Sequence, residues 1–330
     1  MATEREAYIC LSAMLRAREP KLLNTEKSSR MLDSRSFEEC AKMLTDCGYA
    51  DMSQMNAGEI DAALRERRSE IFAEIEHLCP QKELADVFRM KYDYHNAKAI
   101  IKAEAMGLDA KNILSDCGRM DGAKFLSLYN DGRYSELPGK LRDTVPEAKS
   151  ILARTNNPQL SDILLDKAYF AEISEAAEST KCDFLKGYAK VLIDSANLKS
   201  AVRVMRMGKS AVLTDSVLVD GGNVGTDRIK KAGDKESLSA AFSGTVLENA
   251  AHLGGEALSG GSLTSFEREC DNAVNRYLGT AKRVSYGPEA VAAYLAAVEN
   301  EITAVRMILT GKLAGIGSQA LRERLRDLYA

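Results

Sequence analysis

The feature that most constrains the fold of this 330-residue chain is a six-residue pattern that recurs about every 100 residues. The pattern Asp-x-x-Asn-apolar-Lys begins at Asp93 and again at Asp194, and a looser copy, Glu-x-x-Ala-Val-Arg, begins at Glu301. The copies are 101 and 107 residues apart. Repetition at a fixed period is typical of a chain that uses one structural unit several times. The pattern therefore predicts three related units.

A second set of residues has nearly the same period. Phe37, Tyr134 and Leu238 each stand beside a serine just before a helical segment, and they lie 97 and 104 residues apart. The dipeptides Gly118-Arg119 and Gly222-Asn223 are also 104 residues apart. Because separate sets of residues recur at nearly the same spacing, a chance match is improbable. We place the three units at residues 1–114, 115–210 and 211–330, the last with the C-terminal helix.

The fold class follows from proline usage and apolar spacing. The chain has only six prolines, and five of them stand where a helix could begin, a position that needs no N–H donor. Apolar residues recur every three or four positions, which indicates helices with one buried face. Long helices are predicted over residues 58–78, 81–106, 186–206 and 288–312. The sequence thus predicts an all-α protein.

Three short segments complete this interpretation. Pro146 predicts that a helix begins within residues 144–147. Residues 211–220 are compatible with a short strand. The glycine-rich segments 220–225 and 253–256 fit no phosphate-binding motif, so we interpret both as connectors between helices.

Charge and cysteine usage exclude several classes of protein. A net charge of −3 and a pI near 5.9 provide no field that would attract nucleic acid. The longest uncharged apolar run, near residues 290–298, is about half the length of a membrane span. Residues 1–8 lack the apolar stretch of a signal peptide, and the seven cysteines form no Cys-x-x-Cys pair. We expect a cytoplasmic chain with reduced thiols, whose contact with a membrane goes through a partner.

The repeated pattern also supplies the candidate site residues. The polar positions are Asp93, Asn96, Asp194, Asn197, Glu301 and Arg306. On a helix, each acid shares a face with the Asn three residues later. Such positions either hydrogen-bond to a neighbouring helix and fix its register, or they meet a partner protein. Catalysis is the least favoured interpretation because no base, nucleophile or metal ligand accompanies them.

No cofactor or metal is expected. The histidines at 77, 95 and 252 have no second ligand at a metal-binding spacing. Cysteines in helical segments are far more often small buried apolar residues than nucleophiles.

These helices, together with the C-terminal block, resemble a known family. The block runs from Tyr286 to Tyr294, into Glu301-Ile302, and on through residues 306–313. It resembles the C subunit of bacterial and archaeal V/A-type ATPases, which is homologous to the d subunit of the eukaryotic V-ATPase. The likeness extends to residues 8–23 and 36–49. One departure is Ala304, where this family usually carries Asn.

The resemblance implies a shape and a place in a complex. Members of this family are funnel-shaped, with three similar domains around a pseudo-threefold axis. The funnel sits between a central shaft, formed by the D and F subunits, and a membrane ring of proteolipid subunits. By this resemblance the chain is a non-catalytic rotor adapter, peripheral to the membrane on the cytoplasmic side.

A narrower hypothesis concerns the three acids. It places Asp93, Asp194 and Glu301 near the inner surface of the funnel, and it fails if all three are packed inside separate helical bundles.

The competing classes make different predictions. A helical adaptor of another complex would have shorter repeats, near 34–47 residues. An enzyme would have a pocket with convergent titratable groups.

Overall fold

The computed structural model describes residues 5–208 and 211–329. Over these residues the chain forms α-helices and short 3-10 turns, without strands, which confirms the all-α prediction. No helix within the described residues is long and apolar enough to cross a membrane. The chain divides into two compact units. The first combines the residues up to Pro80 with those from Asp194 onward, and the second runs from Gln81 to Ile193.

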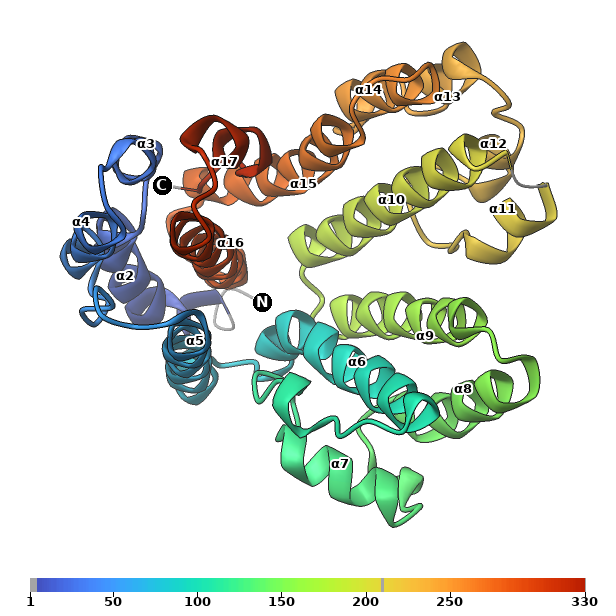
Figure 1. Cartoon of the computed structure of the whole chain (residues 1–330), viewed down its shortest axis with the longest axis horizontal. Helices are drawn as coiled ribbons and strands as arrows, with labels where there is room; N and C mark the ends of the chain where they lie inside the picture. The colour runs from blue at the N-terminus through green and yellow to red at the C-terminus, as the bar shows by residue number, and fades with distance from the viewer. Residues whose placement is uncertain (1–4, 209–210, 330) are drawn as a thin grey trace. The chain divides into compact units, whose positions relative to one another are not determined.

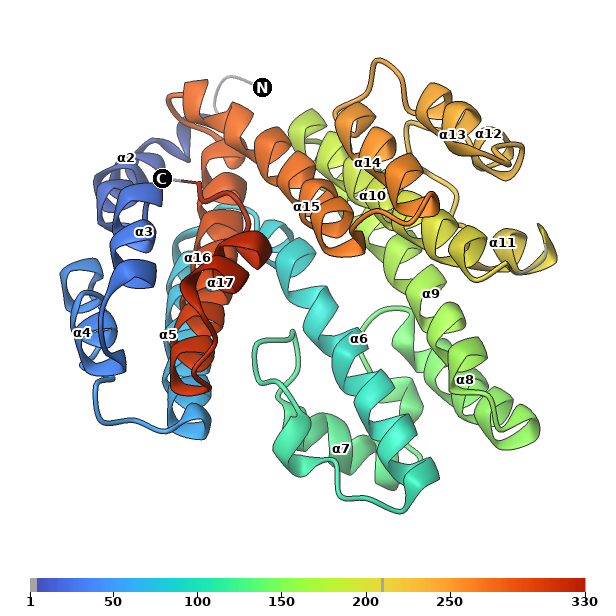
Figure 2. The same ribbon diagram turned by 45° about the horizontal axis from the view of Figure 1, so that its top comes forward.

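The second unit is built on one long helix, α6 (Glu83–Met106), which packs on α8 and α9 (Figures 1 and 2). The other elements are η3 (Lys111–Ile113), α7 (Gly122–Asn130), η4 (Tyr134–Glu136), α8 (Leu141–Thr155) and α9 (Pro158–Ser179). Asn157 caps α9 by accepting the N–H of Gln159. Phe125, Leu141 and Leu165 are fully buried between these helices, so each helix contributes its apolar stripe to a single core.

One part of the first unit is built on α10 (Asp183–Arg206), which belongs to this unit from Asp194 onward. The elements that follow are α11 (Ala211–Val217), α12 (Thr226–Lys230), α13 (Lys235–Ala241), α14 (Glu248–Leu258) and α15 (Leu263–Gly279). Their core contains Val202, Phe242 and Phe266, all fully buried. This part therefore repeats the plan of a long helix covered by the helices that follow it.

The other part of the first unit joins the two ends of the chain. Its long helix is α16 (Pro288–Leu313), which packs on α5 (Ala57–Leu78) and α2 (Ile9–Arg18), as Figure 1 shows. The smaller elements are η1 (Glu19–Lys21), α3 (Thr25–Asp33), α4 (Phe37–Lys42), η2 (Thr45–Cys47), η5 (Thr280–Arg283) and α17 (Ser318–Arg324). Because α16 is covered on several sides, its sequence is apolar over most of its circumference.

The four helices that the sequence predicts as long are present, at 57–78, 83–106, 183–206 and 288–313. Two of the predicted helix starts, Pro158 and Pro288, are the first residues of α9 and α16.

Three local predictions are wrong. Pro146 lies inside α8, which begins at Leu141, because burial of Leu141 and Val145 holds the turn before the proline in the helix. Ala211–Val217 is a helix and not a strand. The segment 253–256 is the interior of α14: a Cβ on Gly254 would lie 3.0 Å from the side chains of Phe266 and Val202, so glycine there permits close helix packing.

We expect the Phe266→Ala substitution to lower the free energy of unfolding of the first unit by about 3–5 kcal/mol, because it leaves a cavity where a fully buried ring now packs. Urea unfolding followed by circular dichroism measures the change. Val246→Ala is the control, since Val246 is exposed and its loss should change stability by about 0.5 kcal/mol or less. Equal effects of the two substitutions would contradict the packing described here.

Candidate functional site

The polar residues of the repeated pattern are buried, with one exception. Asp93, Asn96, Asp194, Asn197 and Glu301 are all at most 2% exposed, whereas Arg306 is on the surface. Each buried residue lies on a long helix and faces a loop that leads into a shorter helix. The three copies can therefore be compared contact by contact.

The acid of each of the first two copies accepts a backbone N–H from such a loop. Asp93 accepts the N–H of Met120 (3.4 Å) and Nε–H of Arg119 (2.7 Å). Asp194 accepts the N–H of Val224 (3.0 Å), with both the N–H and the side-chain amide of Asn223 at 3.0 Å. Met120 and Val224 each stand two residues before the first residue of a helix, α7 and α12. The two acids thus fix equivalent loops.

Glu301 makes the equivalent contact in the third copy, but its loop comes from the other end of the chain. Glu301 accepts the N–H of Leu23 (2.5 Å), and Leu23 stands two residues before α3 begins. The hydroxyl of Tyr49 donates to the other carboxylate oxygen (2.6 Å), and Arg67 lies 3.9 Å from it. The third copy of the pattern is therefore completed by the N-terminal segment.

The asparagine of the pattern makes a two-way hydrogen bond with one backbone residue. Asn96 donates to the carbonyl of Ser115 and accepts its N–H, both at 2.8 Å. Asn197 does the same with Val219, at 2.7 and 2.8 Å. Ser115 and Val219 each stand five residues before the N–H that binds the acid. Ala304 carries no amide, so the third copy lacks this bond.

The cation of the pattern pairs with an aspartate on the last long helix of its repeat. Lys98 pairs with Asp166 of α9, and Lys199 pairs with Asp271 of α15. The third-copy cation pairs with Asp61 of α5 through two hydrogen bonds of 2.8 and 2.9 Å. These pairs are partly exposed, so each adds little stability. They also support the comparison of the three repeats, because the cation of each copy has a partner at an equivalent place.

These contacts define a repeat that begins with its long helix. The bond between Asn96 and Ser115 crosses the boundary expected at residues 114 and 115. We propose units at 83–179 and 183–279, and a third unit in which 288–313 is completed by 22–78. In this arrangement the third unit is circularly permuted relative to the other two.

The cluster of charged residues around Asp93 extends beyond the pattern. Arg119 bridges Asp93 and Glu172 of α9, and Glu172 also accepts the hydroxyl of Tyr94 at 2.6 Å. Gly118 lies so close that a Cβ there would be 2.1 Å from Oδ1 of Asp93. Glu172 is not among the residues predicted from the sequence. The one sequence feature that could have pointed to it is its place next to the apolar Ile173, on the buried side of α9.

Burial controls the ionisation of these groups. Removal from water raises the pKa of Asp93, and the Arg119 guanidinium opposes the shift. Burial likewise raises the pKa of Glu301, against the hydrogen bonds from Tyr49 and Leu23. Tyr49 and Tyr94 have raised pKa values because burial and the adjacent carboxylates both disfavour a phenolate.

The contacts favour one of the two interpretations of the pattern. All three acids are packed inside helical bundles and bind loops of their own chain, so the hypothesis of an inner-surface position is set aside for these side chains. The register-fixing interpretation agrees with every hydrogen bond described above. A partner-facing role stays a prediction for Arg306, whose side chain is 63% exposed.

No group of three or more His, Cys, Asp or Glu side chains within the described residues is arranged to hold a metal ion. Six cysteines are buried, and burial raises the pKa of Cys270 to about 12, which disfavours a thiolate.

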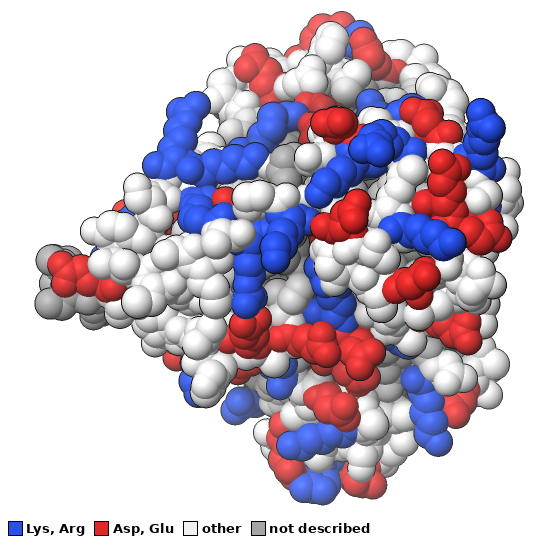
Figure 3. Space-filling view, turned by 90° about the vertical axis from the view of Figure 1, so that its left-hand side faces the viewer, with Lys and Arg blue, Asp and Glu red and all other residues white. Residues whose placement is uncertain are grey.

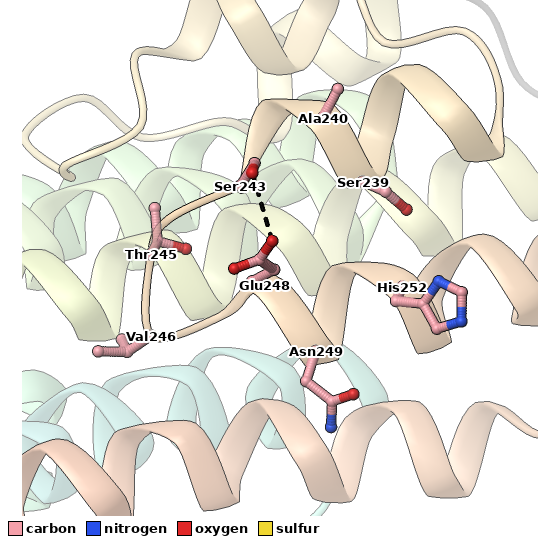
Figure 4. A pocket seen from close by; sticks show the side chains of 8 residues that line it. All are labelled: Ser239, Ala240, Ser243, Thr245, Val246, Glu248, Asn249 and His252. Carbon is pink, nitrogen blue, oxygen red and sulfur yellow. Dashed lines mark hydrogen bonds between the residues drawn. The ribbon is translucent and has the colours of Figure 1, made fainter.

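A recess over α13 and α14 is lined by both polar and apolar side chains (Figure 4): Ser239, Ala240, Ser243, Thr245, Val246, Glu248, Asn249 and His252. Glu248 at its centre accepts the hydroxyl of Ser243 (3.3 Å) and the N–H of Gly244 (3.2 Å). His252 lies 3.4 Å from Glu256. The His252 imidazole thus lies beside Glu256, and the Ser243 hydroxyl bonds to Glu248. Neither pair brings an imidazole next to a hydroxyl, as the activation of a serine nucleophile requires.

The face shown in Figure 3 has Lys, Arg, Asp and Glu side chains interspersed among uncharged residues. Such a mixed surface provides no extended field for nucleic acid. It agrees with the small net charge of the chain.

Comparison with known proteins identifies the family. The family described as ATP synthase (C/AC39) subunit matches residues 11–324. The chain belongs to this family. It is 23% identical to the C subunit of the V-type sodium ATPase of Enterococcus hirae, over 98% of this chain and 99% of that protein. It is 25% identical to the C subunit of the A-type ATP synthase of Methanocaldococcus jannaschii, over 99% and 88% of the two chains.

A third relative covers nearly the whole chain as well. The C subunit of the V-type ATP synthase of Thermus thermophilus is 24% identical over 94% of this chain and 95% of its own length. This family of subunits is non-catalytic, in agreement with the prediction that the chain is not an enzyme.

We expect Asn197→Asp to lower the free energy of unfolding by about 3 kcal/mol. The substitution keeps the side-chain shape but removes the donor to the Val219 carbonyl and places a charge in a buried site. Chemical denaturation measures the change. Asn112→Asp is the matched control, because Asn112 is exposed, and a similar loss in the control would contradict a register-fixing role.

A second prediction concerns Glu301→Gln. The amide can still accept the Leu23 N–H and can donate to the Tyr49 hydroxyl, so the fold should be retained. Because the folded pKa of Glu301 is raised, its contribution to stability is greatest at low pH and decreases as the pH rises above the ordinary glutamate value of about 4.3.

The stability of the Glu301→Gln variant relative to the unsubstituted chain should therefore increase from about pH 4 toward neutral pH. Unfolding curves over this range measure it. The exposed Glu66→Gln serves as the control. Parallel pH dependence of the Glu301→Gln variant and the unsubstituted chain would show that the carboxylate is not destabilised by burial.

Proposed function

We propose that this chain is the central-stalk component that connects a shaft of the D and F subunits to a membrane ring of proteolipid subunits in a V/A-type rotary ATPase. The observation that carries the proposal is the family match over residues 11–324, together with relatives named as C subunits that align over nearly the whole chain. The chain contributes shape and stiffness, and the chemistry of ATP and of the ion belongs to other subunits.

The contacts within each repeat suit a part that carries torque. A twisting load acts on the junctions between helices, and these junctions hold buried carboxylates bound to backbone N–H groups. Slippage of a loop by one residue would leave a buried carboxylate without its donors, which is strongly unfavourable. The junctions therefore resist sliding better than apolar contacts alone, which are not directional.

Three similar units fit the funnel that the resemblance implies. We propose that they are arranged around a pseudo-threefold axis, with the chain bound peripherally at the cytoplasmic face of the membrane. In this position the shaft and the ring are its direct partners. Ion transport then drives the shaft, or ATP hydrolysis turns the ring, through this chain.

Complexes reconstituted without this chain should hydrolyse ATP without pumping ions, because the shaft is no longer fastened to the ring. Adding back the purified chain should restore ion transport measured in sealed vesicles. The surface variant Asn112→Asp is a control that should restore transport as well as the unsubstituted chain. Full coupling of hydrolysis to transport without the chain would contradict the proposal, and capture of unrelated partners would favour a helical adaptor of another complex.

A further inference from the structure

The last residues of the described chain, Leu325–Tyr329, have no regular secondary structure and lie along α15 and α16. Three asparagine side chains bind the backbone of Asp327. Its N–H donates to Oδ1 of Asn272 (2.9 Å), and its carbonyl accepts from the amides of Asn275 (3.2 Å) and Asn300 (2.6 Å). Both hydrogen-bonding groups of one peptide residue are thus held by carboxamides from two helices.

These carboxamides recognise a peptide backbone and not a side chain. A carboxamide offers both a donor and an acceptor, as a peptide group does. Asn272 is only 4% exposed, so its Oδ1 depends on a protein donor more than on water. Asn275 follows one turn later on α15, and Asn300 lies on α16. The set is arranged for an extended segment that passes along both helices.

Side chains on either side of Asp327 add specificity. Arg326 donates to Asp271 of α15 at 2.9 Å. The Tyr329 hydroxyl lies 3.4 Å from Nη1 of Arg16 and 3.3 Å from Glu19, both near the end of α2. The ammonium group of Lys282 lies 4.5 Å from the centre of the Tyr329 ring. The tail thus contacts α15, α16 and the end of α2.

We propose that Asn272, Asn275 and Asn300, with Asp271 and Arg16, form a binding site for an extended peptide, and that residues 325–329 occupy it as a ligand in cis. The tail acts as a strap across three segments that are far apart in the sequence. The ligand class is an extended segment with a basic residue before the bound peptide unit and an aromatic residue two positions after it. This inference is independent of the proposed function.

The direct test uses the chain truncated after Arg324 and an end-blocked peptide with the sequence of residues 325–329, Leu-Arg-Asp-Leu-Tyr. Calorimetry at millimolar peptide should detect saturable binding to the truncated chain, and the peptide should raise its melting temperature. Binding to the full chain should be at least tenfold weaker, since the tail occupies the site. A folded truncated chain that does not bind the peptide, or equal binding to both chains, would overturn the proposal.

Two altered peptides show whether the backbone is what is recognised. A peptide with Asp327→Ala keeps the N–H and carbonyl that the asparagines bind, so its affinity should stay within about threefold, since the Asp327 side chain makes only an exposed 3.9 Å pair with Arg276. A peptide with Asp327→Pro cannot donate to Asn272 and should bind at least tenfold more weakly. Equal affinities for the Ala and Pro peptides would contradict recognition of the peptide group.

The same pair of substitutions in the full chain keeps the test valid if truncation prevents folding. NMR order parameters of the Leu328 and Tyr329 backbone should be lower in Asp327→Pro than in Asp327→Ala, because only the proline removes the donor to Asn272 and releases the strap. Order parameters in α9, which lies in the compact unit of residues 81–193, are the internal control and should be the same in both variants. Identical order parameters for the tail in the two variants would overturn the proposal.

Discussion

The structure depends on a buried carboxylate that accepts the backbone N–H of a loop just before a helix begins. This contact occurs three times, at Asp93, Asp194 and Glu301, and the N–H stands two residues before the helix each time. Burying a carboxylate is costly unless several donors compensate. The fold therefore requires these donors. The loop that carries them can take only one position along the long helix, since any other position would leave the carboxylate without them.

The same contact explains how the two ends of the chain come together. In the first two copies the carboxylate and its loop are separated by about thirty residues, whereas Leu23 and Glu301 are 278 residues apart. The first two repeats can form from contiguous sequence. The third requires α16 to meet α2, α4 and α5, so it can close only after nearly the whole chain is present. The polar contacts of the C-terminal tail with α15, α16 and α2 then fasten this late junction.

The helices and the repeat can be predicted from the sequence, but the hydrogen-bond partners of the repeated residues cannot. Apolar spacing predicts the long helices to within a few residues because burial of one helical face is a local property. The partner of Asn96 lies 19 residues away and could be guessed, whereas Glu172 and Tyr49 lie 78 and 252 residues from the groups they bind. The apolar periodicity of a helix contains no information about partners so far away in the sequence. The misassigned glycines at 254 and 255 have the same cause, since only the neighbouring Phe266 and Val202 make Gly254 favourable inside a helix.

The third repeat departs from the pattern in a way that fits its long-range closure. It lacks the asparagine bond because Ala304 has no amide, and it has Glu where the others have Asp. The added methylene extends the carboxylate toward a loop that no short connection holds nearby. Tyr49 and Arg67 supply further contacts to that carboxylate, and the Arg67 guanidinium lies 3.9 Å above the Tyr49 ring. Side chains from the N-terminal segment thus replace the stabilisation that the missing asparagine gives in the other repeats, so the third unit retains its register with a different set of bonds.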